Sequence, residues 1–251
     1  MRLFTAVWLL LRGTFHVVSG YLTIRLRFPR LSMAEREAVV QNWARQLLRI
    51  WRIDLEVRGE PPMQGPMLLV ANHISWLDIV VMHAACYCRF VSKADVKAWP
   101  VIGMLATGAG TLYITRESRR DALRTVHHMA DALRAGEVLA VFPEGTTSNG
   151  LTLLPFHANL LQAAISANAP VQPVALQFID GPSGEISLTP CYVGDDTLVA
   201  SIWRTLTTPG VRAVVSYGEP QYSHARERRE WAEELRQSVD ELRVSSKFPG
   251  A

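Results

Sequence analysis

Cysteine is scarce in this sequence, and the few cysteines do not form a known set. The 251 residues contain three cysteines, two of which stand in the tripeptide that runs from Cys86 to Cys88. This pattern contains no CxxC pair and an odd number of thiols, so it excludes a CxxC metal or redox motif and a complete disulfide framework. We expect reduced cysteines in a core, as in cytosolic proteins.

Acidic residues are absent from residues 1–30, although this segment carries five arginines. The net charge of the whole chain is only +3, so the positive charge is concentrated at one end. A segment that is both basic and apolar favours an anionic membrane surface over nucleic acid. We therefore expect contact with membrane lipids and no binding of nucleic acid.

Residues 3–28, LFTAVWLLLRGTFHVVSGYLTIRLRF, are long enough to span a bilayer, but Arg12 and His16 interrupt the apolar run. A central arginine costs about 2.5 to 3.5 kcal/mol on the insertion scale. Because no small-residue cleavage site follows, we expect a retained anchor rather than a secretory signal. We expect it to lie in the membrane interface, on the cytoplasmic face of the inner (cell) membrane. A crossing helix and a helix packed on the domain are the alternatives.

The chain length and composition allow one sizeable core, since 49% of the residues are apolar. Residues 31–51 open with Ser32 and Glu35 in capping-box spacing and continue as an amphipathic helix. We expect residues 1–52 to form N-terminal membrane-associating helices. Residues 53–251 should form an α/β domain with a charged C-terminal helix.

Strand and helix patterns alternate along this domain. Strand patterns occur at residues 53–59, 67–71, 89–93, 111–116, 137–143, 171–179 and 211–218, and helical patterns at residues 76–85, 94–107, 119–136, 157–168, 196–206 and 223–244. The alternation predicts an α/β fold with a mostly parallel central sheet flanked by helices. Such sheets carry their chemistry at the carboxyl ends of the strands. His73, Arg116 and Glu144 each follow a predicted strand, so one edge of the sheet could hold all three.

The stretch VANHISWLDIVV, residues 70–81, joins a buried strand to a helix. Ser75 is suited to cap the helix, with Asp78 three residues further on in capping-box spacing. His73 then lies on the loop before the helix, near the positive end of the helix dipole. The Asp78 carboxylate can fold back to accept a hydrogen bond from one ring nitrogen and leave the other bare as a base.

Three further polar positions are weak signals when each is considered alone. Arg116 ends a predicted strand, and an arginine there is usually only solvated. Residues 142–150, FPEGTTSNG, suit an oxygen-rich ligand such as phosphate, but a surface turn has the same composition. Pro173 lies inside a strand pattern, where proline marks an edge strand or a bulge.

Taken in order, NHISWLD, GTLYITR, FPEGTTS and VQPVAL resemble the four blocks of the glycerolipid acyltransferases, specifically the 1-acylglycerol-3-phosphate (lysophosphatidate) acyltransferase family. The resemblance covers about residues 67–180. It implies a glycerol-3-phosphate acyltransferase-like fold and transfer of an acyl group from acyl-CoA or acyl-carrier protein to a lysolipid hydroxyl. It also implies that His73 is the general base and Asp78 its partner. The matching substrate-binding positions are Arg116, Glu144, Gly145 and Thr146 for the acceptor, with Ser148 beside them, and Pro173 on the acyl side.

Two positions depart from the pattern of phosphatidate-forming members. Thr147 stands where many have arginine, and His157 stands where lysine is common. Each charge-assisted bond to a phosphate contributes roughly 1.5 to 3 kcal/mol, so these changes bear on the acceptor. PEGTTS resembles the variant in acyltransferases that complete ornithine lipids, whose head group has no phosphate. Lysophosphatidate remains the first expected acceptor because Arg116 is retained.

Other classes fit the residues less well. A serine hydrolase with Ser75 as nucleophile lacks the GxSxG elbow, and Ser75 already has a capping role. A metal hydrolase built on His73, Asp78 and Glu144 lacks an HxxxH-type pair. An inactive membrane lipid-binding protein would have no need to retain both His73 and Asp78. We expect an enzyme with no metal site and no cofactor, in which the acyl thioester is a co-substrate.

Overall fold

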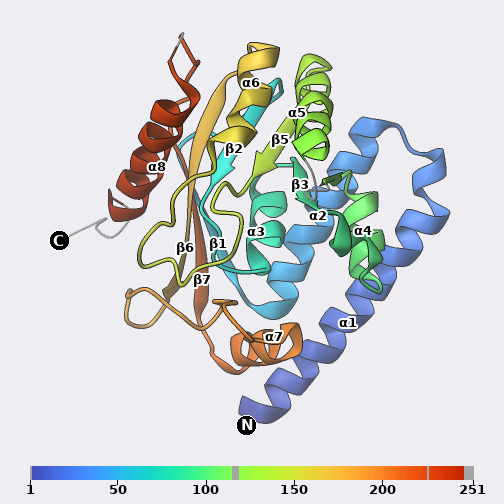
Figure 1. Ribbon diagram of the computed structural model, residues 1–251. Coiled ribbons are helices and arrows are strands. Elements are labelled where there is room, and N and C mark those ends of the chain that lie inside the picture. Colours follow the sequence, from blue (N-terminus) through green and yellow to red (C-terminus); the bar gives the residue numbers. More distant parts are fainter. Residues whose placement is uncertain (1, 115–118, 225, 246–251) are drawn as a thin grey trace.

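The central sheet organises the molecule (Figure 1). The computed structural model describes residues 2–114, 119–224 and 226–245. Within these residues seven strands form one sheet in the order β1-β7-β6-β2-β5-β3-β4. Their bounds are β1 Asp54–Arg58, β2 Met67–Ala71, β3 Arg89–Lys93, β4 Leu112–Ile114, β5 Val138–Val141, β6 Val171–Asp180 and β7 Val211–Tyr217. Neighbouring strands are parallel except β6 and β7, so the expected mostly parallel α/β sheet is confirmed.

Helices cover both faces of the sheet (Figure 1). On the first face lie α2 (Met33–Trp51), α3 (Leu77–Ala85) and α7 (Leu198–Thr207), with α1 (Arg2–Leu26) outside them. On the second face lie α5 (Arg119–Arg134), α6 (Leu161–Ala167) and α8 (Arg228–Ser245). The alternation of side chains along β2 explains how one strand serves both layers. Leu69 packs in the first core and Leu68 in the second.

The helix expected at residues 94–107 is interrupted. The structure has a 3-10 helix, η2 (Ala94–Ala98), followed by a break and then α4 (Ile102–Gly108). Pro100 explains the break, because proline supplies no N–H and disfavours helical backbone at the residue before it. Another short 3-10 helix, η3 (Ala158–Leu160), precedes α6, which therefore begins later than its sequence pattern predicts.

Pro173 lies in an interior strand, so the alternative that it marks a sheet edge is wrong. β6 is flanked by β2 and β7, and Pro173 is aligned with Val70 of β2. The Pro173 carbonyl accepts a hydrogen bond from the Gly218 N–H at 2.9 Å. Proline is tolerated here because its carbonyl still bonds across the sheet, although it contributes no donor.

One side of α1 is built to pack closely on the rest of the chain. Ala6 and Leu9 are buried, and Gly20 lies against the indole of Trp43, where an added Cβ would come within 2.5 Å of Nε1. His16 stacks on Trp43 with ring centroids 5.1 Å apart. The Trp43 indole in turn donates to the His16 carbonyl at 3.2 Å. Small residues and one histidine thus seat α1 on α2, which the 3-10 helix η1 (Phe28–Arg30) joins to it.

The opposite side of α1 exposes large apolar side chains. Phe4 is 84% exposed and Phe15 75% exposed, and the same side carries Leu3, Val7, Trp8, Leu11, Val18, Leu22 and Leu26. Among the described residues, Leu3–Leu26 is the one helical stretch long and apolar enough to cross a membrane, by length and composition. Figure 1 shows α1 passing α7 near its N-terminus and α4 further along, so it follows the outside of the domain.

Candidate active site

Strand order brings two distant segments together at the carboxyl ends of the parallel strands. β2 and β5 are parallel neighbours, with Val70 aligned to Val141. The residues that follow each strand therefore emerge side by side. His73 follows β2, and Phe142 and Glu144 follow β5. This is the edge at which the sequence places the chemistry of a parallel sheet.

His73 and Asp78 are in direct contact. The His73 Nδ1 lies 2.8 Å from the Asp78 Oδ2. Asp78 is in the first turn of α3 and is fully buried, whereas the His73 side chain is 20% exposed. The same Oδ2 accepts the backbone N–H groups of Ile74 at 2.6 Å and Ser75 at 2.9 Å. An oxygen that receives two N–H donors acts as an acceptor, so the contact places a proton on Nδ1; in the neutral imidazole, Nε2 then keeps a bare lone pair.

Ser75 has a structural role that differs in detail from the predicted cap. α3 begins at Leu77, and the Ser75 Oγ accepts the Leu77 N–H at 3.2 Å instead of the Asp78 N–H. The same hydroxyl donates to the Pro190 carbonyl at 2.5 Å. Ser75 is also fully buried. These contacts remove the hydroxyl from the surface and argue against Ser75 as a nucleophile.

Asn72 extends the end of β2 with its side chain. Its Nδ2 donates to the Leu176 carbonyl at 3.0 Å, and its Oδ1 accepts the Leu176 N–H at 2.7 Å. Asn72 is buried. The backbone pairing of β2 with β6 stops at Ala71, and the side-chain amide of Asn72 continues it with hydrogen bonds to the β6 backbone. The start of the loop that carries His73 is therefore anchored to β6.

Glu144 lies beside His73 but is nearly closed off from solvent. It is 4% exposed, and its Oε1 accepts the His73 backbone N–H at 2.8 Å. Its Oε2 accepts the Leu154 N–H at 2.9 Å. Burial raises the pKa of the Glu144 carboxyl, and the N–H groups of Leu154 and His73 oppose this shift.

The other predicted residues of this loop lie on the same edge. Gly145 has a φ of 72°, a left-handed backbone that glycine adopts at little cost, and its N–H donates to the Phe142 carbonyl at 3.1 Å. Thr146 is exposed. The Ser148 N–H donates to the His73 carbonyl at 2.9 Å. Thr147, which replaces an expected arginine, donates its hydroxyl to the Tyr192 carbonyl.

The described structure does not test the roles predicted for Arg116 and Pro173. Arg116 lies outside the described residues. Pro173 is buried within β6 rather than at its carboxyl end. The predicted contact of Arg116 with the acceptor and the predicted acyl-side role of Pro173 therefore remain predictions.

Sequence reasoning missed three residues that shape this edge. The Phe142 ring stacks on the His73 imidazole, with centroids 4.0 Å apart and planes 7° apart. Arg204 donates to the carbonyls of Thr189 at 2.9 Å and Cys191 at 2.5 Å, in the segment that covers Ser75. Arg243, in the charged C-terminal helix, donates to the Gly150 carbonyl at 2.6 Å. The position of Phe142 directly after a buried strand was the only local signal, since contacts of the two arginines depend on tertiary structure.

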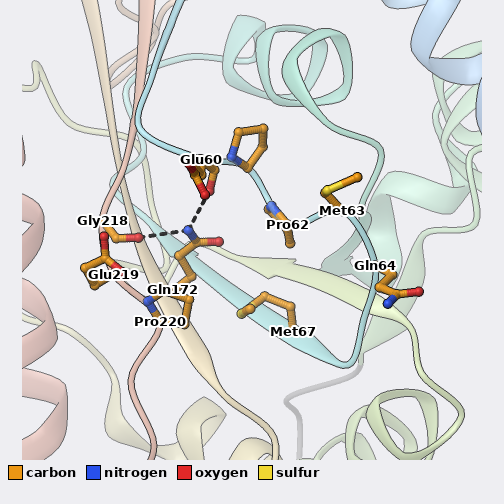
Figure 2. Close-up of a pocket in the computed structure, with 10 residues that line it drawn as sticks. Glu60, Pro62, Met63, Gln64, Met67, Gln172, Gly218, Glu219 and Pro220 are labelled. Atoms are coloured by element: carbon orange, nitrogen blue, oxygen red, sulfur yellow. Dashed lines mark hydrogen bonds between the residues drawn. The ribbon is translucent and has the colours of Figure 1, made fainter.

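A cavity of about 290 Å³ lies at the amino-terminal end of β2, the end opposite to the His73 loop (Figure 2). Its wall includes Met67, the first residue of β2, whereas His73 follows the last residue of that strand. Gln172 donates its amide hydrogens to the carbonyls of Glu60 at 2.9 Å and Gly218 at 2.8 Å. This cavity is therefore separate from the candidate active site.

The chain is similar in sequence to known acyltransferases. Residues 53–177 match the Acyltransferase family model. The lyso-ornithine lipid O-acyltransferase of Pseudomonas aeruginosa is 36% identical over 225 residues, which cover 88% of this chain and 85% of that protein. The chain belongs to the Acyltransferase family. Membership in this family, together with the relatives below, supports an O-acyltransferase enzyme.

A second relative is similar over a shorter stretch. The 1-acyl-sn-glycerol-3-phosphate acyltransferase of Neisseria meningitidis is 40% identical over 174 residues, which cover 68% of this chain and 67% of that protein. The crystal structure of the LPA acyltransferase PlsC from Thermotoga maritima superposes with a TM-score of 0.69 at 21% identity. That match covers 97% of this chain and 98% of the other, so the two share a fold across nearly their whole length.

Proposed function

We propose that this protein transfers an acyl group from a thioester to the free hydroxyl of a lysolipid. The contact of 2.8 Å between His73 Nδ1 and Asp78 Oδ2 carries the proposal. It orients a partly exposed imidazole at the sheet edge where α/β proteins bind their ligands. Residues 53–251 form the acyltransferase domain, and residues 1–52 attach it to the membrane.

The proposed reaction needs a base and an activated acyl group. The bare Nε2 of His73 takes the proton of the lysolipid hydroxyl while the hydroxyl oxygen attacks the thioester carbonyl carbon. The new C–O bond forms, the C–S bond breaks, and the imidazolium returns its proton to the leaving thiolate. Asp78 steadies the imidazolium from the Nδ1 side. No covalent acyl-enzyme is required, because the thioester is already activated.

We propose two acceptors for this site. 1-Acylglycerol-3-phosphate is the first, because Arg116 offers a cation for a phosphate. A lyso-ornithine lipid is the second, and two observations favour it. Thr147 is neutral, and its hydroxyl is already bonded to the Tyr192 carbonyl, so this position supplies no cation for a phosphate. The relative from Pseudomonas aeruginosa, named for that acceptor, matches more of the chain than the relative from Neisseria meningitidis.

The acyl donor is acyl-CoA or acyl-carrier protein, and the membrane supplies the lysolipid. The exposed apolar side of α1 would dip into the cytoplasmic leaflet of the inner membrane, with the arginines near its end on anionic head groups. Contacts of α1 with α7, α4 and α2 support an interfacial position over a crossing one. A helix that packs on the domain at both ends cannot leave it to span a bilayer without losing those contacts.

The base role is tested by replacing His73 with alanine. We expect acyl transfer to fall by about 10²- to 10⁴-fold, the usual contribution of a general base. The matched control is His127→Ala, because His127 is exposed on α5 and lies outside the site. Release of free thiol and formation of labelled product measure the rate, and circular dichroism confirms folding. Turnover of His73→Ala near that of the parent would remove His73 from this role.

The acceptor is tested with a panel of purified lysolipids. The parent protein is mixed with labelled acyl-CoA or acyl-carrier protein and with 1-acylglycerol-3-phosphate, lyso-ornithine lipid or a neutral lysolipid. Product from 1-acylglycerol-3-phosphate supports the first acceptor. Product from lyso-ornithine lipid alone would replace it with the second.

A further inference from the structure

One segment, residues 142–148, contacts His73 at three points. The Phe142 ring lies flat on the imidazole, with centroids 4.0 Å apart. The Glu144 carboxylate accepts the His73 N–H at 2.8 Å. The Ser148 N–H donates to the His73 carbonyl at 2.9 Å. Both backbone polar groups and the ring of His73 are therefore held by a segment about 70 residues away in the chain.

The contacts of Glu144 leave it poorly placed to hold an acceptor. Each of its oxygens already accepts a backbone N–H, one from His73 and one from Leu154. The residue is 4% exposed, so neither oxygen faces open solvent. A carboxylate also repels a lysolipid phosphate, because both groups are negatively charged.

Asp78 alone does not fix where His73 lies. Asp78 sets the rotation of the ring through Nδ1, but it also bonds to the N–H groups of Ile74 and Ser75 in the same loop. Asn72 anchors the start of this loop to β6, but the bonds to the backbone N–H and carbonyl of His73 itself come from Glu144 and Ser148. Glu144 and Ser148 tie the His73 backbone to the end of β5, which is paired with β2 in the sheet. A displacement of about 1 Å at a reacting group can reduce the rate by about 10²-fold.

We propose that residues 142–148 are a clamp for His73, and that Glu144 and Phe142 are positioning residues that act on the reaction through His73. The inference rests on the proposed function, in which His73 is the base. It assigns the Glu144 carboxylate to the histidine loop instead of to the acceptor lipid. The clamp joins the two parallel strands that meet at the site.

The kinetic test compares Glu144→Ala, Glu144→Gln and the matched control Glu185→Gln, whose parent residue is exposed. We expect Glu144→Ala to lower kcat by about 10²-fold with KM for the lysolipid within about threefold of the parent's. Glu144→Gln keeps one acceptor oxygen and should recover part of kcat. A rise in KM of more than about tenfold with kcat retained would overturn the clamp and assign Glu144 to the acceptor.

The ring contact is tested by Phe142→Leu and Phe142→Tyr. Tyrosine keeps the flat ring against the imidazole, so we expect Phe142→Tyr to retain most of kcat, whereas Phe142→Leu should lose about tenfold or more with KM unchanged. Equal kcat in Phe142→Leu and the parent would contradict a positioning role for the ring.

Hydrogen exchange tests the clamp without any assay of activity. The His73 amide donates to Glu144, so in Glu144→Ala its exchange should be at least about tenfold faster than in the parent, while the Glu185→Gln control matches the parent. Unchanged exchange would overturn the clamp. If the parent acylates no lysolipid in the panel, the proposed function fails, and the exchange result still decides whether residues 142–148 hold His73.

Discussion

The helices on the two faces of the sheet bury similar side chains but expose different ones. On the second face α8 covers the sheet with the fully buried Trp231, and its outer side carries charged pairs such as Arg236 with Glu233. On the first face α1 packs through small residues and exposes an apolar row that includes Phe15. The outer surface of the second face is therefore suited to water. The outer surface of the first face is suited to an apolar environment, in which exposed apolar side chains carry no free-energy cost.

The two faces also differ in how deeply their histidines are buried. His83 on α3 is in the first core, with its ring edge-on to that of Phe90, and burial lowers its pKa to about 4. On the second face, His127 and His128 of α5 are exposed. The first core therefore contains a buried histidine that is harder to protonate in the folded protein, whereas the two histidines of α5 are exposed to solvent.

The largest effect should come from emptying the second core. Trp231→Ala removes a fully buried indole, and we expect a loss of about 3 to 5 kcal/mol in the free energy of unfolding. Arg236→Ala, on the outer side of α8, is the control and should change it by about 0.5 kcal/mol or less. Urea unfolding followed by circular dichroism measures both. A loss of less than about 1 kcal/mol in Trp231→Ala would contradict the packing of α8 described above.

A smaller effect should appear in the pH dependence of the free energy of unfolding, which distinguishes the buried His83 on the first face from the exposed histidines on the second. Because the pKa of His83 is lower in the folded protein than its ordinary value of 6.5, the unfolded chain binds a proton first as the pH falls. The contribution is present above about pH 6.5 and is lost on acidification, with about 2 kcal/mol gone between about pH 8 and about pH 5. Urea unfolding at both pH values should show this loss in the parent but not in His83→Gln.

The matched variant for that experiment is His128→Gln, on the exposed side of α5. It should keep the pH dependence of the parent, because the buried His83 is retained in this variant. If His83→Gln retained the full loss of stability, the acid sensitivity would have to come from other groups.

The smallest effect should appear in membrane binding. Phe15→Ser removes an exposed apolar side chain from α1, and we expect binding to anionic vesicles to weaken about tenfold. This is slightly below the roughly 1.5 to 3 kcal/mol gained by full burial, because an interfacial helix buries the side chain only in part. Leu123→Ser is the control, because Leu123 is exposed on the second face, on α5. Vesicle sedimentation measures both variants. Equal loss in the two would mean that the faces do not differ in lipid contact.

Local patterns in the sequence determined much of this protein. The short apolar run of β2 and the helix that follows it place His73 on a loop and Asp78 in a first helical turn, five residues apart, so their contact could be anticipated without the fold. The row of apolar residues in α1 likewise follows from helical spacing. Local signals succeed in these cases because the interacting groups are neighbours in the chain.

Tertiary structure alone decided which distant residues surround His73. No local pattern states that β5 is the neighbour of β2, and this pairing is what brings Phe142 and Glu144 to the histidine. It also decided that Pro173 lies in an interior strand and that Arg243 of α8 holds the Gly150 carbonyl. Strand order is set by the packing of the whole sheet, so periodicity within one segment carries no information about it.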